Sequence, residues 1–301
     1  MNISRSSALR ILAAGMAAPL VGCSQANTMV VPHVDPDPSK PTTFGVQMYP
    51  GDDVQTSLAL IAGCKAKLVR MALTGNSDDP GRLAALLPVA AALGIRIVLV
   101  TASPPQPVDI AQYTAYNVAI QQQYAQYAPI WEIWNEPNLA AAWRATPNVD
   151  DYSHLALAVG GALRSAGATD VWSGGTSGLD AGWLNGMLKN NVFSVLTGCG
   201  VHTYEPVGGA LDHYLQLQAM LPSGIRLQTT ETGVPTGADE PDYLTGMWYV
   251  HRQLSLPTMI WVEFRDGTAG VSGPNSFSYG LVTSNYTPKL DYYTARGLVG
   301  T

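Results

Sequence analysis

Two glutamates stand out because each follows or ends a short apolar segment. Glu136 follows "PIWEIWN" (129–135) and Glu231 ends "IRLQTTE" (225–231), in a chain of which only 13% is charged. A carboxylate at the end of a buried strand is either half of an ion pair or a catalytic group. Two facing carboxylates suit glycoside hydrolysis, in which a carboxylic acid protonates the leaving oxygen while a carboxylate attacks the anomeric carbon or activates water.

The elements that must position these glutamates form a repeating pattern from residue 43 onward. Apolar, β-branched runs predict strands at 43–49, 66–73, 95–102, 129–135, 170–175, 199–204, 225–231 and 258–264. Helical spacing of leucine and alanine fills the segments between them, such as 80–94, 108–128 and 150–168. Eight alternating units predict a single (β/α)8 (TIM) barrel. An open sheet is disfavoured, since no glycine-rich phosphate turn follows Tyr49.

A barrel confines function to the C-terminal ends of its strands, and polar residues gather there. They are Arg70 on the second strand, Asn135 and Glu136 on the fourth, His202 and Tyr204 on the sixth, Glu231 on the seventh, and Trp261, Glu263, Arg265 and Asp266 on or after the eighth. Glu132 is in phase with Glu136 but lies four residues deeper, where we expect an interior ion pair. Glu205 and Glu263 are lesser rivals, and Asp266 is expected to anchor a loop.

Several of these segments resemble one enzyme group. "WEIWNEPN" (131–138) resembles the fourth-strand signature of the clan A glycoside hydrolases, and "LQTTETG" (227–233) and "VHTYEP" (201–206) resemble their seventh- and sixth-strand motifs. Arg70 and Trp261 match the second-strand arginine and eighth-strand tryptophan of that clan. The C-terminal segment, from "WVEFRDG" onward, is similar to the end of glycoside hydrolase family 39 and its bacterial exopolysaccharide-associated relatives. The resemblance covers residues 43–301.

The resemblance implies a retaining mechanism with Glu136 as general acid/base and Glu231 as nucleophile. It also implies substrate-binding roles: Arg70 and Tyr204 beside Glu231, Asn135 at the 2-hydroxyl of the sugar, His202 beside the substrate or the acid/base, and Trp261 as a face for the sugar ring. An acid must arrive protonated, so we expect the pKa of Glu136 to lie above the ~4.3 of a free glutamate. An apolar wall from Trp131 and Trp134 and the second carboxylate would raise it.

Other residues have plainer interpretations. Trp143, Trp172 and Trp183 suit either sugar platforms or core packing. His154, His213 and His251 lie in helical stretches without ligand spacing, so we expect no metal and no cofactor. Cys64 and Cys199 precede the second and sixth strands, on opposite sides of a barrel, and are expected to remain free thiols. The net charge of −6 argues against a nucleic-acid partner.

The N-terminus is typical of an exported protein. Arg5 and Arg10 precede an apolar run, Ile11 to Gly22, that is too short to span a bilayer. Residues 20–23, Leu-Val-Gly-Cys, resemble the bacterial lipobox. We therefore expect a signal peptide at 1–22, lipidation of Cys23, a proline-rich tether at 23–42, and attachment to the outer membrane of a Gram-negative bacterium. An ordinary signal peptide with an incidental cysteine is the alternative.

These observations lead to a hypothesis and two alternatives. The preferred function is endo-acting hydrolysis of a β-linked polysaccharide, either a bacterial exopolysaccharide or a plant-type glycan, by a monomer tethered through its lipid. One alternative is an exo-acting β-glycosidase. The other is a carbohydrate-binding lipoprotein that uses a barrel as scaffold and does not hydrolyse its ligand, for which a lost catalytic carboxylate would be expected.

Overall fold

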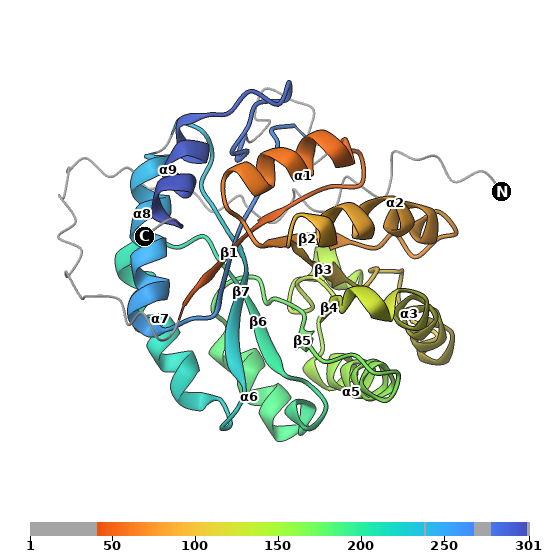
Figure 1. Cartoon of the computed structure of the whole chain (residues 1–301). Coiled ribbons are helices and arrows are strands. Elements are labelled where there is room, and N and C mark those ends of the chain that lie inside the picture. The colour runs from red at the N-terminus through yellow and green to blue at the C-terminus, as the bar shows by residue number, and fades with distance from the viewer. Residues whose placement is uncertain (1–40, 238, 268–277, 300–301) are drawn as a thin grey trace.

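The computed structural model describes residues 41–237, 239–267 and 278–299, and these form a closed barrel of parallel strands in the order β1 to β8. The strands are β1 (Thr43–Gln47), β2 (Leu68–Ala72), β3 (Arg96–Val100), β4 (Ile130–Ile133), β5 (Val171–Ser173), β6 (Gly198–Thr203), β7 (Arg226–Thr232) and β8 (Thr258–Trp261). Each overlaps a predicted strand, so the predicted (β/α)8 barrel is confirmed. Figure 1 shows helices arranged around the outside of the strands.

The helices are α1 (Val54–Gly63), α2 (Asp79–Ala92), α3 (Ile110–Tyr124), α4 (Ala140–Trp143), α5 (Val149–Ser165), α6 (Ala181–Lys189), α7 (Val207–Met220), α8 (Glu240–Leu254) and α9 (Leu290–Leu298), with 3₁₀ turns at Ala125–Tyr127 and Val192–Ser194. Asp53, Asp109, Asn148 and Asp180 cap α1, α3, α5 and α6 by accepting hydrogen bonds from first-turn N–H groups. Gly94 follows α2 with φ +66, a conformation that suits glycine. Local sequence therefore sets where these helices begin and end.

The strands alternate between the barrel interior and the helix layer. Leu68, Val98, Ile130, Trp172 and Ile260 form a small apolar cluster of their own, which is the floor of the barrel interior. Side chains two residues further along the same strands point the same way, one layer closer to the C-terminal mouth. On β2 and β4 this layer begins the polar cluster that the site is built from.

Several sequence expectations are settled by the packing. Trp172 belongs to the interior floor, while Trp143 and Trp183 lie in a row of packed rings with Tyr152 between them, so all three serve the core. Cys64 and Cys199 are buried free thiols, as expected. The predicted signal peptide, Cys23 and the tether up to residue 40 lie outside the described residues. Within the described ranges, no helix combines the length and apolarity that crossing a bilayer requires.

Candidate active site

Arg70 is the centre of the polar cluster at the barrel mouth. Its side chain is 1% exposed, and its Nη1 lies 2.5 Å from Glu231 Oε1. Its Nε lies 2.6 Å from Glu132 Oε2, and its Nη2 donates to Asn135 Oδ1 at 2.7 Å. Burial lowers the pKa of Arg70, but the negative charges of Glu132 and Glu231 raise it by a larger amount. The net shift of the Arg70 pKa is therefore upward. One guanidinium thus fixes both carboxylates, and it orients Asn135 so that Nδ2 remains the amide group available to a ligand.

Glu132 is the ion-pair partner of Arg70, as predicted. It is fully buried and also accepts hydrogen bonds from Gly175 N and Thr230 Oγ1, both at 3.0 Å. Burial raises its pKa, but Arg70 and His202 lower it to about 2. Glu132 therefore remains ionised and enclosed, and its role is to hold the cluster together.

Glu231 points into the barrel because of an irregularity in β7. Thr230 faces inward, and Glu231 would face outward in a regular strand. The register of β7 against β8 shifts between Thr229 and Thr232, however, and a bulge of this kind can re-aim a side chain. Glu231 reaches Arg70 on one oxygen and accepts a hydrogen bond from Tyr204 Oη at 2.6 Å on the other. Both contacts expected of a nucleophilic carboxylate are present.

His202 lies between the carboxylates. Its Nδ1 is 3.1 Å from Glu136 Oε1 and 3.5 Å from Glu231 Oε2, and its Nε2 is 3.9 Å from Glu132 Oε1. Burial lowers its pKa, but Glu231 and then the other two glutamates raise it to about 9. The imidazole is fully buried behind Gly175, where a Cβ would collide with Nε2. The surrounding carboxylates therefore favour the imidazolium form of His202.

Glu136 lies just after β4, in backbone that departs from the strand. Trp134 has φ +75 and Glu136 has φ +47, and Glu136 N donates to Gly175 O at 2.9 Å. Left-handed backbone is uncommon for such residues and often marks functional sites. The turn carries the carboxylate back over the barrel mouth, where its side chain is 12% exposed and Oε1 contacts His202.

The expected rise in the pKa of Glu136 is wrong for the free protein. Burial does raise this pKa, but hydrogen bonds from His202 and Ser177 and the charge of His202 lower it more. The expected apolar wall is also missing, since Trp131 donates to Gln121 of α3 and Trp134 packs on Trp143. Both indoles point into the helix layer, because strand alternation directs Glu132 inward and its neighbours outward.

Trp261 does not join the cluster. Ile260 belongs to the interior floor, so Trp261 points outward, where it packs on Tyr243 of α8 and donates to Tyr279 O at 2.8 Å. Its side chain is 0% exposed. The expectation that Trp261 offers a ring face to a sugar is therefore corrected, because this ring has no open face.

The rival carboxylates occupy other positions. Glu205 pairs with His213 at 2.7 Å on the surface, and Glu263 is buried after β8, near Tyr49. Asp266 accepts a hydrogen bond from Gly280 N at 2.8 Å and lies 3.4 Å from Lys289, so it anchors a loop as predicted. Glu136 and Glu231 are thus the pair of carboxylates that face each other at the mouth.

The separation of these groups defines what they can do. Ligand atoms of Glu136, His202 and Glu231 all lie within 4.8 Å of one another. Carboxyl groups about 5–5.5 Å apart are typical of retaining glycosidases, whereas inverting enzymes separate them by about 6.5–9.5 Å. The same three groups are close enough to hold a metal ion, but Arg70 already pairs with Glu231, and protonation of His202 would compete with a metal. We assign no metal site to them.

Four residues of the site were not singled out from the sequence. Gln47 accepts from Arg70 at 2.5 Å, Thr230 binds Glu132, and Ser177 binds Glu136. Tyr49 lies near Glu263 and Glu231, whose charges, with burial, raise its pKa. For Gln47 and Thr230 the inward phase of their strands was a usable signal, whereas Ser177 lies in a loop without one.

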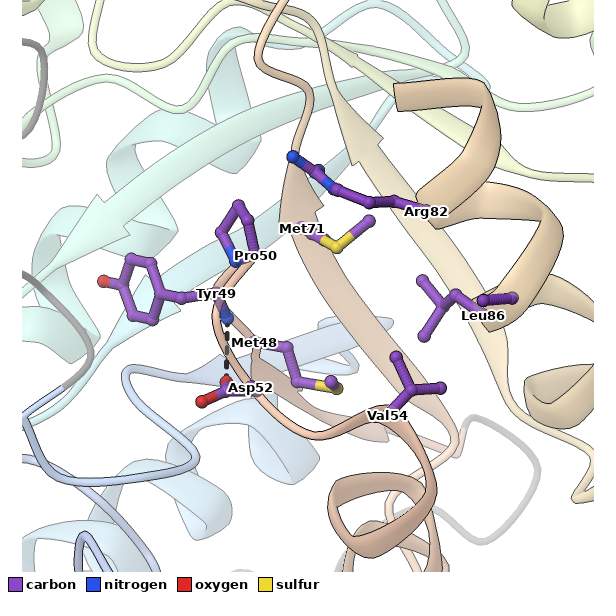
Figure 2. A pocket seen from close by; sticks show the side chains of 9 residues that line it. Met48, Tyr49, Pro50, Asp52, Val54, Met71, Arg82 and Leu86 are labelled. Carbon is purple, nitrogen blue, oxygen red and sulfur yellow. Dashed lines mark hydrogen bonds between the residues drawn. The ribbon is translucent and has the colours of Figure 1, made fainter. Parts of the chain in front are cut away.

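Figure 2 shows a small pocket beside β1, lined by residues that include Met48, Met71 and Leu86, with the ring of Tyr49 turned away from it. The Tyr49 backbone N donates to Asp52 Oδ2 at 2.9 Å, and Asp52 in turn binds Arg265 at 2.7 Å. The pocket has a volume of about 110 Å³, which is below the range of about 300–1,000 Å³ that is typical of ligand pockets. The loop after β1 thus directs Tyr49 elsewhere, and the pocket is no substrate site.

No family model and no curated protein matches the sequence. Solved structures do match. A glycoside hydrolase family 39 β-xylosidase from Caulobacter crescentus is 14% identical over 90% of this chain and 73% of its own, with a TM-score of 0.71. A family 39 enzyme from Xanthomonas axonopodis pv. citri is 16% identical over 88% and 67%, with a TM-score of 0.68. An endo-1,4-β-mannanase from Rhizomucor miehei is 13% identical over 86% and 95%, with a TM-score of 0.64.

The chain has the fold of these glycoside hydrolases. The resemblance inferred from the motifs is thus confirmed at the level of the fold. At such low identity the likeness says nothing of the substrate, and the chemistry of this chain must be argued from its own residues.

Proposed function

We propose that the protein is a retaining glycoside hydrolase that cleaves a β-linked polysaccharide by double displacement. The observation that carries the proposal is that one carboxylate oxygen of Glu136 and one of Glu231 lie within 4.8 Å of each other at the barrel mouth. Such a close approach favours a carboxylate that attacks the anomeric carbon itself over an inverting base, which stands further from the acid to leave room for a water molecule.

The two steps follow from the contacts of each group. Glu231 attacks the anomeric carbon while Glu136 protonates the leaving oxygen, and Arg70 and Tyr204 keep the attacking carboxylate in place. Glu136 then takes a proton from the water that hydrolyses the glycosyl-enzyme. Asn135 Nδ2 is available to the 2-hydroxyl of the sugar, a contact that strengthens in the transition state.

Endo-action is the finer part of the proposal. The described residues form a single barrel, and its mouth suits an open cleft in which a polymer can bind along its length. The matched endo-1,4-β-mannanase and an endo-β-1,4-glucanase from Xanthomonas axonopodis pv. citri are covered over 95% and 98% of their chains. The match to family 39 β-xylosidases supports the alternative of an exo-acting β-glycosidase. A binding protein without activity is disfavoured because both carboxylates are in place.

A panel of β-glucans, xylans and mannans tests the proposal directly. Purified protein is incubated with each polymer, and the release of reducing ends is compared with that of a Glu231→Gln variant. Activity in the wild type alone, with a rapid fall in polymer viscosity, supports endo-hydrolysis. Release of monosaccharide from chain ends without a fall in viscosity supports exo-action. Equal activity in the variant would remove Glu231 from the mechanism.

We also propose that Cys23 is lipidated and tethers the domain to the cell envelope, as a monomer at the outer membrane. The lipobox-like residues 20–23 support this proposal. Mass spectrometry of the membrane fraction should find diacylglyceryl-modified Cys23 as the first residue of the mature protein. A soluble mature protein that begins at another residue would contradict the tether.

A further inference from the structure

His202 is the residue on which the charge of the whole site depends. Charged side chains from three strands surround the imidazole. Arg70 comes from β2, Glu132 and Glu136 come from β4 and the turn after it, and Glu231 comes from β7. Tyr204, which follows β6, donates to Glu231, and Tyr49, after β1, and Glu263, after β8, are further titratable groups near the cluster. The imidazole is 0% exposed, so water does little to screen these charges.

The cluster holds three carboxylates and one guanidinium. Without a further proton it would carry two negative charges in a largely buried site, which is strongly unfavourable. Arg70 contacts Glu132 and Glu231 at 2.6 and 2.5 Å, so its single positive charge is shared between these two carboxylates. One additional proton is therefore shared by the two remaining groups, His202 Nδ1 and Glu136 Oε1, which lie 3.1 Å apart.

We propose that the free protein keeps this proton on His202 and that a bound sugar moves it along the existing hydrogen bond to Glu136. In this step the Nδ1–H bond breaks and an Oε1–H bond forms, so that imidazolium and carboxylate become imidazole and carboxylic acid. The net charge of the site does not change. The first half of the proposal concerns the free protein alone, and the second half rests on the proposed function.

The resting position of the proton follows from the partners of each group. Ser177 hydrogen-bonds to Glu136 and favours its ionised form. Asn138 holds Ser177 in place, because its Oδ1 accepts from Ser177 N at 2.8 Å and its Nδ2 donates to Ser177 O at 3.1 Å. The imidazolium meanwhile has two carboxylates near Nδ1, at 3.1 and 3.5 Å, while Nε2 lies 3.9 Å from Glu132 Oε1, too far for a hydrogen bond, and is attracted to that carboxylate by charge alone. Both contributions put the proton on His202 while the site is empty.

A bound sugar reverses this preference. A glycosidic oxygen accepts hydrogen bonds and cannot donate one. Glu136 can therefore hydrogen-bond to this oxygen only when it is a protonated carboxylic acid, and not when it is a carboxylate. The sugar also removes water from Glu136, which is 12% exposed in the free protein, and lost hydration favours the neutral acid. Sugar hydroxyls that donate to Glu231 reduce its attraction for the imidazolium. His202 is therefore a positioning residue for the proton that Glu136 delivers.

Histidine ¹⁵N NMR of the free protein tests the first half. His202 should titrate from imidazolium to imidazole with a midpoint near pH 9, whereas buried His251, whose pKa burial lowers to about 4, should stay neutral above pH 6. Glu136→Gln should lower the His202 midpoint by about one unit or more, since it removes a charged partner. A neutral His202 at pH 7 in the wild type would overturn the proposal.

The pH dependence of kcat/KM tests the second half, measured on whichever β-glucan, xylan or mannan the wild type hydrolyses. His202→Asn should move the basic limb to lower pH by about one unit or more, because Glu136 must then hold the proton alone. If His202 had only a structural role, His202→Asn would lower kcat at every pH without moving the basic limb. That result would overturn the proposal.

A further variant covers the case in which His202→Asn does not fold. Ser177→Ala keeps the imidazole and should lower its titration midpoint, because Glu136 loses a donor that stabilises its ionised form. An unchanged midpoint would contradict proton sharing between the two groups. If no glycan is hydrolysed at all, the proposed function fails, while the NMR titration still decides where the proton lies.

Discussion

Arg70 Nη1 lies 2.5 Å from Glu231 Oε1 in a site that buries the guanidinium almost completely. Breaking a buried ion pair by removing one partner leaves an unpaired charge and costs about 3–5 kcal/mol. Arg70→Met should therefore lower the free energy of unfolding by about that amount and also reduce activity, since Glu231 loses the group that orients it. Chemical denaturation and kcat/KM on a hydrolysed glycan measure the two effects.

Arg96→Met is the matched control for Arg70→Met. Arg96 pairs with Asp170 at 2.8 Å, but both side chains are more than a third exposed, and such pairs contribute about 0–1 kcal/mol. We expect little change in either measurement. Equal destabilisation by both substitutions would contradict the central place of Arg70.

Glu132 should govern part of the acid stability. Its pKa is about 2 in the folded protein, below the ~4.3 of an unfolded chain. The stabilisation from this shift is therefore complete above about pH 5 and is lost as the pH falls toward 2, with a total of roughly 3 kcal/mol. Glu132→Gln should be less stable than the wild type at pH 7 and should show a shallower decline below pH 5.

Urea denaturation at a series of pH values measures the effect of Glu132→Gln. Asp170→Asn serves as control, because this substitution removes a carboxylate of an exposed pair and should leave the slope of stability against pH close to that of the wild type. A decline in Glu132→Gln as steep as in the wild type would assign the acid sensitivity to other carboxylates.

Glu136→Gln should separate substrates by their leaving groups. General acid catalysis contributes about 10²–10⁴-fold, so hydrolysis of a natural glycan should fall by that factor. A dinitrophenyl glycoside needs no proton on its leaving oxygen, and formation of the glycosyl-enzyme from it should be little changed. Burst-phase kinetics measure that first step.

Glu205→Gln is the control for the acid/base variant. Glu205 also follows a barrel strand, but it pairs with His213 on the surface, so activity on both substrates should stay near that of the wild type. An equal loss on both substrates in Glu136→Gln would argue against a role as proton donor.

The sequence predicts the barrel and the strand-end residues well, for one physical reason. In a parallel barrel the order of strands along the chain determines which side chains share the mouth. Arg70 and Glu231 are 161 residues apart in sequence, yet they could be placed in one site before any distance was known. The same reasoning placed Glu132 deeper in the interior, where the structure shows its ion pair.

The features that were mispredicted depend on details finer than strand order. Trp261 points outward because Ile260, the residue before it on β8, points into the barrel. In a strand of only four residues, the sequence alone does not show which side chains face inward. Glu231 lies at the mouth as predicted, but it points inward only through a shift in register that the residue types do not indicate. The low pKa of Glu136 depends on a 3.1 Å contact with His202, a distance that a sequence does not contain.

The most direct test of the proposed mechanism is chemical rescue of a variant that lacks the nucleophile. Glu231→Ala should lose activity by roughly 10⁴-fold or more, as enzymes do when a nucleophile is removed. Added azide is small enough to occupy the space that the carboxylate leaves and should restore turnover of an activated β-glycoside, with an α-glycosyl azide as product. Full activity of Glu231→Ala without azide, or rescue that yields only the β-anomer, would contradict the assignment of Glu231 and the retaining mechanism built on it.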